Sequence, residues 1–406
     1  MRLFAPLLVR LCGAGALAAA LASCTATTST GAAPPALSPV EPAVGPPAPN
    51  GVNPFAGARI YINPDRVQDL RAVAQRHRDS AALLAKMEAF PTAIWASWLR
   101  DTATVSRYLD DARAQQEAEG VPVVPVFVVY DLPGRDCNAA ASAGELTPDA
   151  AGEARYQHAF IDPIATAFRA HPDQRIVVVL EPDSLSNLVT NMQNPSCARV
   201  ADIYKRGIAY AISRLSLPNV FVYLEAAHGG WLGWPKNLAR SVPLYKQVIE
   251  MAGGPDRIRG FAVNVSNYDP VRRSDSGPRD PAVAPPDELG YVADLARGLA
   301  QVGITGKGFL IDTGRNGRAD IRGNPASWCN VKGAGLGERP RAAPAPLVDA
   351  YLYIKVPGES DGTSDPRAAR FDETCGAEDA APGAPEAGLV FDDYLIDLAR
   401  NAEPPL

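Results

Sequence analysis

Seven short apolar runs, separated by longer stretches with helical spacing, form the hydrophobic pattern of the chain from residue 54 onward. The clearest run begins at residue 121 (VPVVPVFVVY) and is rich in β-branched residues on both of its alternating faces. Such a run is typical of a strand that is buried on both sides. The runs lie at residues 92–97, 124–131, 175–183, 219–228, 260–267, 308–315 and 349–358.

The stretches between the runs predict helices at residues 101–120, 198–215 and 287–303, among others. Strands that alternate with such helices predict parallel βαβ units. Seven strands favour an α/β fold of the (β/α) barrel type, complete or incomplete, over an open doubly wound sheet. The length of the chain fits one large α/β domain or two smaller ones. No G-x-G-x-x-G motif follows the first strand, so nucleotide binding has no support.

The polar residues that follow the apolar runs are mostly carboxylates. In a parallel barrel these strand ends converge on one face, where catalytic residues gather. The chain has four His and no G-x-S-x-G motif, which argues against a Ser-His-Asp hydrolase and favours acid–base chemistry on a polyol. For any single strand end, a solvated loop junction is the simpler interpretation. The strand ends carry Asp136; Glu181 and Asp183; Glu225 and His228; Asn267; Asp312 and Arg315; and Lys355, Glu359 and Asp361.

Asp183 is the strongest candidate for a general acid. It follows a fully apolar run, so burial should favour its protonated form, and a second carboxylate such as Asp136 would raise its pKa further. Glycoside hydrolysis needs such a protonated carboxyl. Taken alone, however, Asp183 is better explained as the N-cap of the helix that follows it.

The five tryptophans lie at or near the strand ends. Indole rings stack on the apolar faces of sugars, so tryptophans beside carboxylates fit a polysaccharide cleft, although a core position is more usual for any one of them. The segment 231–235 (WLGWP) is expected to be a sugar-binding loop rather than a core strand. The tryptophans are Trp95, Trp98, Trp231, Trp234 and Trp328.

The N-terminus predicts export. Residues 1–23 begin with positive charge and continue with an apolar run that is too short to span a bilayer easily, as in a signal peptide. The run ends in LASC, which resembles the lipobox of bacterial lipoproteins and implies lipidation at Cys24; an ordinary cleaved signal peptide is the alternative. Residues 24–53 are rich in Pro and Ala and predict a semi-extended linker. Lipidation would anchor the protein at the cell surface or in the periplasm without a membrane span.

Net charge and cysteine content bear on the possible partners of the chain and on the state of its cysteines. The net charge of −6, without a basic stripe, argues against a nucleic-acid partner. An even number of cysteines in an exported chain predicts two disulfides, with three possible connectivities, of which sequence order favours neighbouring pairs. Zinc is the alternative, but no C-x-x-C spacing supports it. The four cysteines after the linker are Cys137, Cys197, Cys329 and Cys375.

Seven motifs occur in one order across residues 53–406. They resemble those of glycoside hydrolase family 6, the cellobiohydrolase II and endoglucanase family. The resemblance implies an α/β fold, a distorted seven-stranded parallel (β/α) barrel that forms a single catalytic domain at residues 54–406. It also implies hydrolysis of β-1,4-glucan with inversion and no requirement for a metal or organic cofactor. It also implies the disulfides Cys137–Cys197 and Cys329–Cys375. The motifs are YDLPGRDCNAAASAGE, LEPDSLSNLVTN, HGGWLGWPKN, NVSNY, DTGRNG, WCNVKGAGLGERP and KVPGESDGTSD.

The resemblance also implies roles for individual residues. Asp183 corresponds to the catalytic acid, Asp136 to the carboxylate that raises its pKa, and Tyr130 to the tyrosine that helps to distort the sugar ring. Asp361 corresponds to the proposed base, and Ser142 would position a water. Glu225 departs from the family, which usually has Asp there, so its role is open. The implied substrate contacts are Trp95, Ser97, His228, Trp231, Asn267, Trp328, Lys355 and Glu359.

The long segment 364–388 resembles the cellobiohydrolase type of loop and favours release of cellobiose from chain ends. An endo-β-1,4-glucanase, a catalytically silent glucan-binding lipoprotein and an enzyme for another β-glucan are the alternatives. We expect a monomer that acts on cellulose or cello-oligosaccharides.

Overall fold

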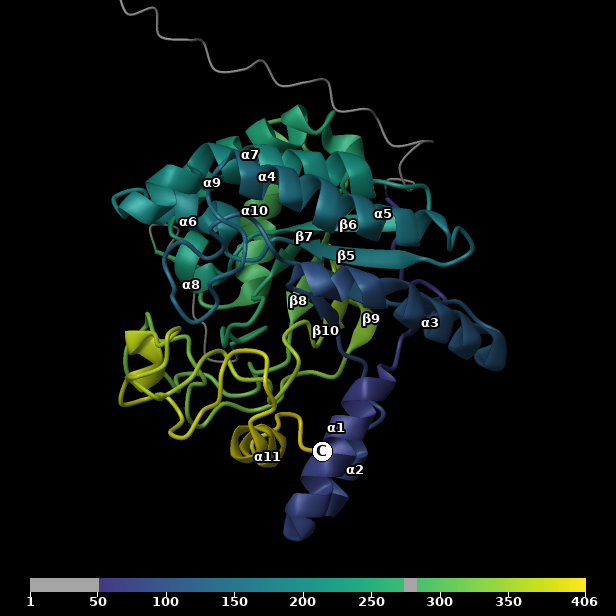
Figure 1. The fold of residues 1–406 in the computed structure, drawn as a ribbon, viewed down its shortest axis with the longest axis vertical. Coiled ribbons are helices and arrows are strands. Elements are labelled where there is room, and N and C mark those ends of the chain that lie inside the picture. Colours follow the sequence, from purple (N-terminus) through teal and green to yellow (C-terminus); the bar gives the residue numbers. More distant parts are fainter. Residues whose placement is uncertain (1–50, 274–282) are drawn as a thin grey trace, which may run out of the picture. The chain divides into compact units, whose positions relative to one another are not determined.

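The computed structural model describes residues 51–273 and 283–406 (Figure 1). The predicted signal peptide, Cys24 and almost all of the predicted linker lie outside these residues. No helix in the described ranges is long and apolar enough to cross a membrane.

Seven parallel strands form the main sheet, and each overlaps one of the predicted runs, so the predicted barrel strands are confirmed. Their order follows the sequence, as expected for successive βαβ units. The parallel strands are β2 (Ile94–Ala96), β4 (Val126–Val129), β5 (Ile176–Leu180), β6 (Val220–Glu225), β7 (Gly260–Val263), β8 (Gly308–Asp312) and β10 (Val348–Leu352).

The barrel is distorted at the junction of its first and last parallel strands. There, in the part of the chain that the structure describes, one parallel bridge joins Thr92 to Tyr353 in place of a full ladder. An eighth strand, β9 (Arg341–Ala345), pairs antiparallel with β10 and was not predicted, because RAAPA is neither β-branched nor alternating. A small separate sheet pairs β1 (Arg59–Ile60) with β3 (Val123–Val124).

Helices follow the strands, and their boundaries have recognisable causes. The Asn194 side chain caps α7 (Pro195–Leu215), which begins with a proline. The Asp287 side chain caps α10 (Glu288–Gln301). Gly120 ends α3 in the left-handed conformation that favours glycine. The helices are α1 (Pro64–Arg76), α2 (Ala81–Met87), α3 (Val105–Glu119), α4 (Ala150–Arg155), α5 (Asp162–Arg169), α6 (Ser184–Thr190), α7 (Pro195–Leu215), α8 (Gly229–Leu232), α9 (Pro235–Met251), α10 (Glu288–Gln301) and α11 (Asp392–Arg400).

The barrel strands are buried on both faces. Val126 and Val128 belong to the core cluster inside the barrel, whereas Phe127 and Val129 belong to the cluster shared with the surrounding helices. Each fully buried Val or Phe contributes about 1.5–3 kcal/mol. The double burial explains why the strands appear in the sequence as continuous apolar runs.

A second core lies beside the barrel and supports one wall of its open end. It joins α1, α2 and α11 through side chains such as Val73, Leu84 and Leu395. Figure 1 shows these helices on the opposite side of the sheet from α7 and α9. The residues that begin α1, including Asp65 and Arg66, thereby reach the cleft described below.

Candidate active site

A cleft of about 830 Å³ opens beyond the carboxyl ends of the parallel strands. All thirteen residues predicted to be catalytic or substrate-binding line it, although the runs that carry them span most of the chain. They are Trp95, Ser97, Tyr130, Asp136, Ser142, Asp183, His228, Trp231, Asn267, Trp328, Lys355, Glu359 and Asp361.

The backbone turns sharply where these strands end. Asp136, Asp183, Ala227 and Ser266 all have positive φ, between 53° and 63°. Non-glycine residues seldom adopt this conformation, and such strain gathers at functional sites. The turns direct the loops after four successive strands toward the cleft.

Asp183 is poised as an acid. It occupies the N-cap position of α6, but its side chain makes no capping hydrogen bond, so the simpler N-cap interpretation does not hold. Burial raises its pKa well above the ordinary aspartate value, and the nearby carboxylates Asp136, Glu225 and Asp361 raise it further. The Asp183 carboxyl therefore retains its proton at pH values where an ordinary aspartate is ionised.

Asp136 is held beside Asp183 by hydroxyl groups. Ser142 Oγ donates a hydrogen bond to Asp136 Oδ2, and the Tyr130 hydroxyl lies 3.4 Å from the same oxygen. Burial raises the pKa of Asp136, while the hydrogen bond from Ser142 opposes that increase. The three residues thus form one hydrogen-bonded group at the end of β4.

Asp361 has the opposite electrostatic environment. Its carboxylate pairs with Arg315 Nη1 at 2.5 Å and with Lys355 Nζ at 3.3 Å, and it accepts a hydrogen bond from the Asn330 backbone at 2.8 Å. Burial alone would raise its pKa, but Arg315 and Lys355 hold the pKa of Asp361 below the usual range. The cleft therefore contains a protonated carboxyl and an ionised one.

Aromatic side chains line the cleft on several sides. The Trp95 ring packs edge-on against Tyr130 and receives Lys355 Nζ at 5.8 Å, while its Nε1 donates to Ile354 O. Trp231 donates a hydrogen bond to Thr190. Trp234 lies outside the lining and is 47% exposed. The segment 231–235 is not the single loop that was predicted: it contains the end of α8, a two-residue connection and the first residue of α9. Sugar binding by Trp234 stays a prediction.

Two segments, residues 136–145 and 364–388, both line the cleft and meet each other; we call them the cleft loops. Asp372 accepts a hydrogen bond from the Ala140 backbone at 2.9 Å. Ala141 packs against the disulfide between Cys329 and Cys375. The cleft loops therefore bridge the space above the strand ends.

Both predicted disulfides are present, Cys137–Cys197 and Cys329–Cys375. The first ties a cleft loop to α7, and the second ties the other cleft loop to the segment that carries Trp328. Since disulfides persist in oxidising compartments, they agree with an extracytoplasmic location.

Three strand-end carboxylates that were expected to point into the cleft do not line it. Glu181 accepts hydrogen bonds from the Asp131 and Leu132 backbone amides, and Asp312 accepts them from four backbone amides. Glu225 accepts two hydrogen bonds, from the backbone amides of Asp183 at 3.0 Å and Ala227 at 2.5 Å. These carboxyls hold the loops in place because buried amides need acceptors.

Two arginines complete the site and were not identified as site residues from the sequence. Arg315 pairs with Asp361, as described above. Arg135 donates hydrogen bonds to the carbonyl oxygens of Ser97, Tyr130 and Ser142, and so fixes the start of a cleft loop. Both follow strand ends, which is the signal that could have identified them.

Comparisons with known proteins agree with this geometry. The family model "Glycosyl hydrolases family 6" matches residues 55–402. The chain belongs to this family. Exoglucanase 3 of Agaricus bisporus is 39% identical over 87% of this chain and 80% of its own length. A Fusarium oxysporum relative with the provisional name endoglucanase type B is 41% identical over 87% of this chain and 77% of its own.

Solved structures lead to the same family. Cellobiohydrolase II of Humicola insolens, in complex with glucose and cellotetraose, superposes with a TM-score of 0.83 at 37% identity and covers 87% of this chain and all of its own. The family 6 chain described here is therefore a cellulose-degrading glycoside hydrolase with the distorted barrel of its family.

Proposed function

We propose that this family 6 enzyme is an inverting cellobiohydrolase that cleaves β-1,4-glucosidic bonds near the end of a glucan chain. The observation that carries the proposal is the pairing of a protonated Asp183 with an ionised Asp361 in one bridged cleft. Inverting hydrolysis needs one carboxyl of each kind, on opposite faces of the sugar.

In the proposed reaction, Asp183 gives its proton to the oxygen that leaves with the departing sugar. Its raised pKa keeps the proton available at pH values where an ordinary aspartate would have lost it. Asp136 maintains this pKa by charge repulsion and stabilises the positive charge that develops on the sugar ring. The Tyr130 ring, fixed against Trp95, presses the sugar toward the distorted shape that precedes cleavage.

The attacking water is activated on the side of Asp361. Asp361 is the final acceptor of the proton that the attacking water loses. Because Arg315 and Lys355 reduce the basicity of Asp361, the proton reaches it through a chain of water molecules rather than by direct contact. Ser142, hydrogen-bonded to Asp136, holds one water molecule of this water chain. His228, Trp231, Asn267, Trp328, Lys355, Glu359, Trp95 and Ser97 contact the bound glucan.

Action at chain ends is supported by the contact between the cleft loops. The hydrogen bond from Ala140 to Asp372, and Arg370 placed 5.6 Å from the Trp98 ring, restrict entry from above. A chain threaded from its end would release cellobiose. The relative with an endoglucanase name favours internal cleavage as the second candidate.

One experiment separates these candidates. Cellohexaose hydrolysis is followed by proton NMR for the anomer formed first, and products are sized by chromatography. The proposal expects the α-anomer and mainly cellobiose, with little loss of viscosity in carboxymethylcellulose. A β-anomer would contradict inversion, and a rapid viscosity loss would indicate endo action. No turnover would favour the glucan-binding alternative, and faster turnover of a mixed-linkage glucan would indicate another substrate.

The doubly substituted variant Arg370→Ala/Asp372→Ala sharpens the test of the cleft loops. It removes the contacts with Trp98 and Ala140 but leaves Asp136, Asp183 and Asp361 in place. We expect its activity on carboxymethylcellulose to rise relative to that on cellohexaose. An unchanged ratio would contradict the role assigned to the cleft loops.

We further propose that the enzyme is exported and anchored through a lipid on Cys24. The disulfides and the predicted signal peptide support export, and the LASC sequence supports the anchor. In a bacterial host, metabolic labelling with a fatty acid should tag the wild type and not Cys24→Ala. Equal labelling of the two proteins, or none, would contradict the anchor.

A further inference from the structure

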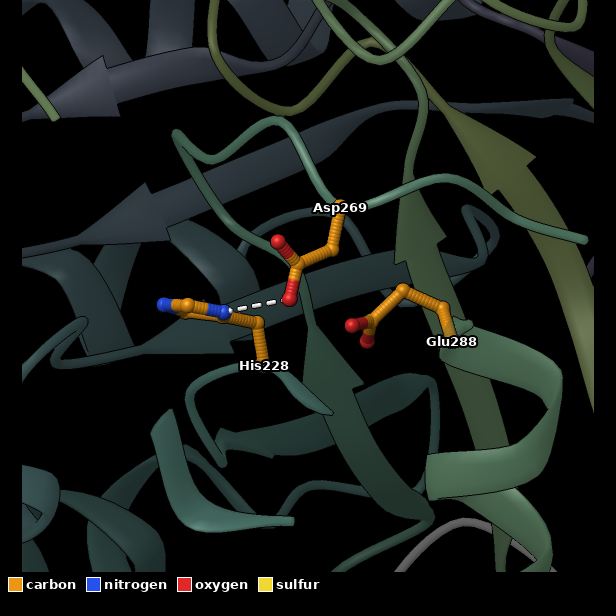
Figure 2. Close-up of side chains that lie close together, drawn as sticks. All are labelled: His228, Asp269 and Glu288. Carbon is orange, nitrogen blue, oxygen red and sulfur yellow. Dashed lines mark hydrogen bonds and ion pairs between the residues drawn. The ribbon is translucent and has the colours of Figure 1, made fainter. Parts of the chain in front are cut away.

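A cluster of three metal-ligating side chains lies at the edge of the cleft and has no role in the proposed reaction as a cluster. It consists of His228 after β6, Asp269 after β7 and Glu288 at the start of α10. One ligand atom from each side chain lies within 4.8 Å of the others. Figure 2 shows all three side chains pointing toward one shared space, with the imidazole hydrogen-bonded to Asp269.

The carboxyl of Glu288 is only half satisfied. Glu288 is fully buried, and its Oε1 accepts a hydrogen bond from the Gly229 backbone at 2.7 Å. Its Oε2 is buried and has no hydrogen-bond partner. A buried acceptor without a partner lowers the free energy of unfolding by about 1–3 kcal/mol, so a ligand bound to this oxygen would recover stability. Figure 2 shows the Glu288 carboxyl facing Asp269 and His228.

We propose that His228, Asp269 and Glu288 form a binding site for a divalent transition-metal ion of the zinc class. One imidazole and two carboxylates are ligands that zinc accepts, and a water would supply the fourth position. Imidazole favours zinc and copper over magnesium and calcium, which prefer oxygen ligands alone. The site does not depend on the proposed glucanase function.

The spacing of the ligand atoms suits such an ion after small side-chain movements. Zinc bonds of about 2.0–2.1 Å in a tetrahedron place ligand atoms about 3.4 Å apart. The His228 Nδ1 and Asp269 Oδ2 atoms, now 2.7 Å apart, would open, and the Glu288 oxygen would approach them. A metal ion takes the place of protons on its ligands, so binding at such a site weakens as the pH falls.

The positive charge of Arg322 should weaken metal binding at this site. Arg322 pairs with Asp269 Oδ1, whereas His228 and the Gly230 backbone share Oδ2. An ion bound to Oδ2 leaves the arginine contact in place, but the guanidinium charge repels it. Removing this charge should therefore tighten zinc binding, an effect that adventitious surface sites would not share.

The proposed metal site also lies next to the cleft and shares His228 with its lining. His228 and Arg322 line the cleft, which gives the ion a route of entry. Coordination at Nδ1 fixes the imidazole in one tautomer and orientation. Bound zinc should therefore lower turnover through His228 without competing for the carboxyl groups of Asp183 or Asp361.

The test is zinc titration calorimetry on the full exported protein after chelator treatment, with magnesium as the comparison ion. We expect one zinc site per chain and none for magnesium. Glu288→Gln should weaken zinc binding at least about tenfold, since even lost outer contacts of a metal site cost about 10–100-fold. Arg322→Gln should tighten it. His77→Gln and His158→Gln, which each remove a more exposed His–Asp pair, serve as controls and should leave zinc binding unchanged.

Each result of the zinc titrations either supports or overturns the proposal. No stoichiometric zinc binding by the wild type would overturn the proposal, as would full binding by Glu288→Gln or loss of binding in either histidine control. If Glu288→Gln does not fold, as judged by circular dichroism, Asp269→Asn replaces it with the same expected loss. Glucan hydrolysis is measured separately, so a failed zinc site leaves the proposed function standing.

Discussion

Replacing Lys355 by Met should move the acid limb of the pH–activity profile upward. Lys355 Nζ lies 3.3 Å from Asp361 Oδ1 and contributes to the lowered pKa of that carboxyl. Methionine keeps the length and most of the packing of lysine but carries no charge. Asp361 retains its ion pair with Arg315 and its hydrogen bond from Asn330, so the carboxylate is not left unpaired.

The size of the effect follows from the distance. Unit charges at 3.3 Å interact by about 5 kcal/mol at an effective dielectric constant of about 20, which corresponds to a change of about 4 in the pKa. This value is an upper bound, because Arg315 remains and water fills part of the space left by the ammonium group. We expect the acid limb to rise by about 1–2 pH units.

The assay measures kcat/KM for cellotetraose between pH 3 and pH 8. Lys355 also lines the cleft, so the level of activity is expected to fall, but only a change in Asp361 ionisation moves the limb. Lys246→Met, at a salt-bridged lysine on the outer surface of α9, is the matched control and should leave the limb in place. If Lys355→Met lowers activity without moving the limb, the reasoning that Asp361 must be ionised is refuted.

Three further predictions follow from the same structure. Asp136→Asn removes the carboxylate that helps to raise the pKa of Asp183, so the alkaline limb of kcat/KM should move to lower pH; an unmoved limb would break the proposed coupling. Replacing Cys329 and Cys375 by Ser should cost about 4 kcal/mol by loop entropy across 46 residues, read as a lower unfolding midpoint in denaturant under non-reducing conditions. Thermal stability should be higher at pH 5 than at pH 7.5. Burial raises the pKa of Asp131 to about 8, of Glu181 to about 7 and of Glu225 to about 8. As the pH rises from 5, the unfolded chain loses these protons before the folded protein does, so the folded state becomes less stable. Calorimetry that shows a higher midpoint at pH 7.5 would contradict these assignments.

The sequence predicted the strands well because their burial on both faces leaves a direct trace in composition. Runs such as VPVFVVYD and RIVVVLEPD have no polar position before the strand ends, and each became a strand of the barrel. The strand β9 left no such trace. It is a largely exposed edge that contains a proline, a position where pairing tolerates residues that a central strand would not.

The cleft residues were predicted through their shared position at strand ends, and this rule also caused the errors. Glu181 and Asp312 satisfy the same rule, yet each carboxyl accepts hydrogen bonds from backbone amides and does not itself line the cleft. The side to which each carboxyl points depends on its contacts with distant segments, such as those of Asp312 with the Ser266 and Lys355 backbone amides. For the same reason, the distant partners of Arg315 and Glu288 could not be derived from local pattern.

The most direct test of the account compares two leaving groups in Asp183→Asn. An acid is needed to cleave a bond to glucose, whose oxygen leaves as a strong base, but not to release dinitrophenolate, which is stable as an anion. The account predicts that Asp183→Asn loses about 10²–10⁴-fold in kcat on cellohexaose and far less on 2,4-dinitrophenyl cellobioside. Equal losses on both substrates would contradict the claim that Asp183 is the proton donor.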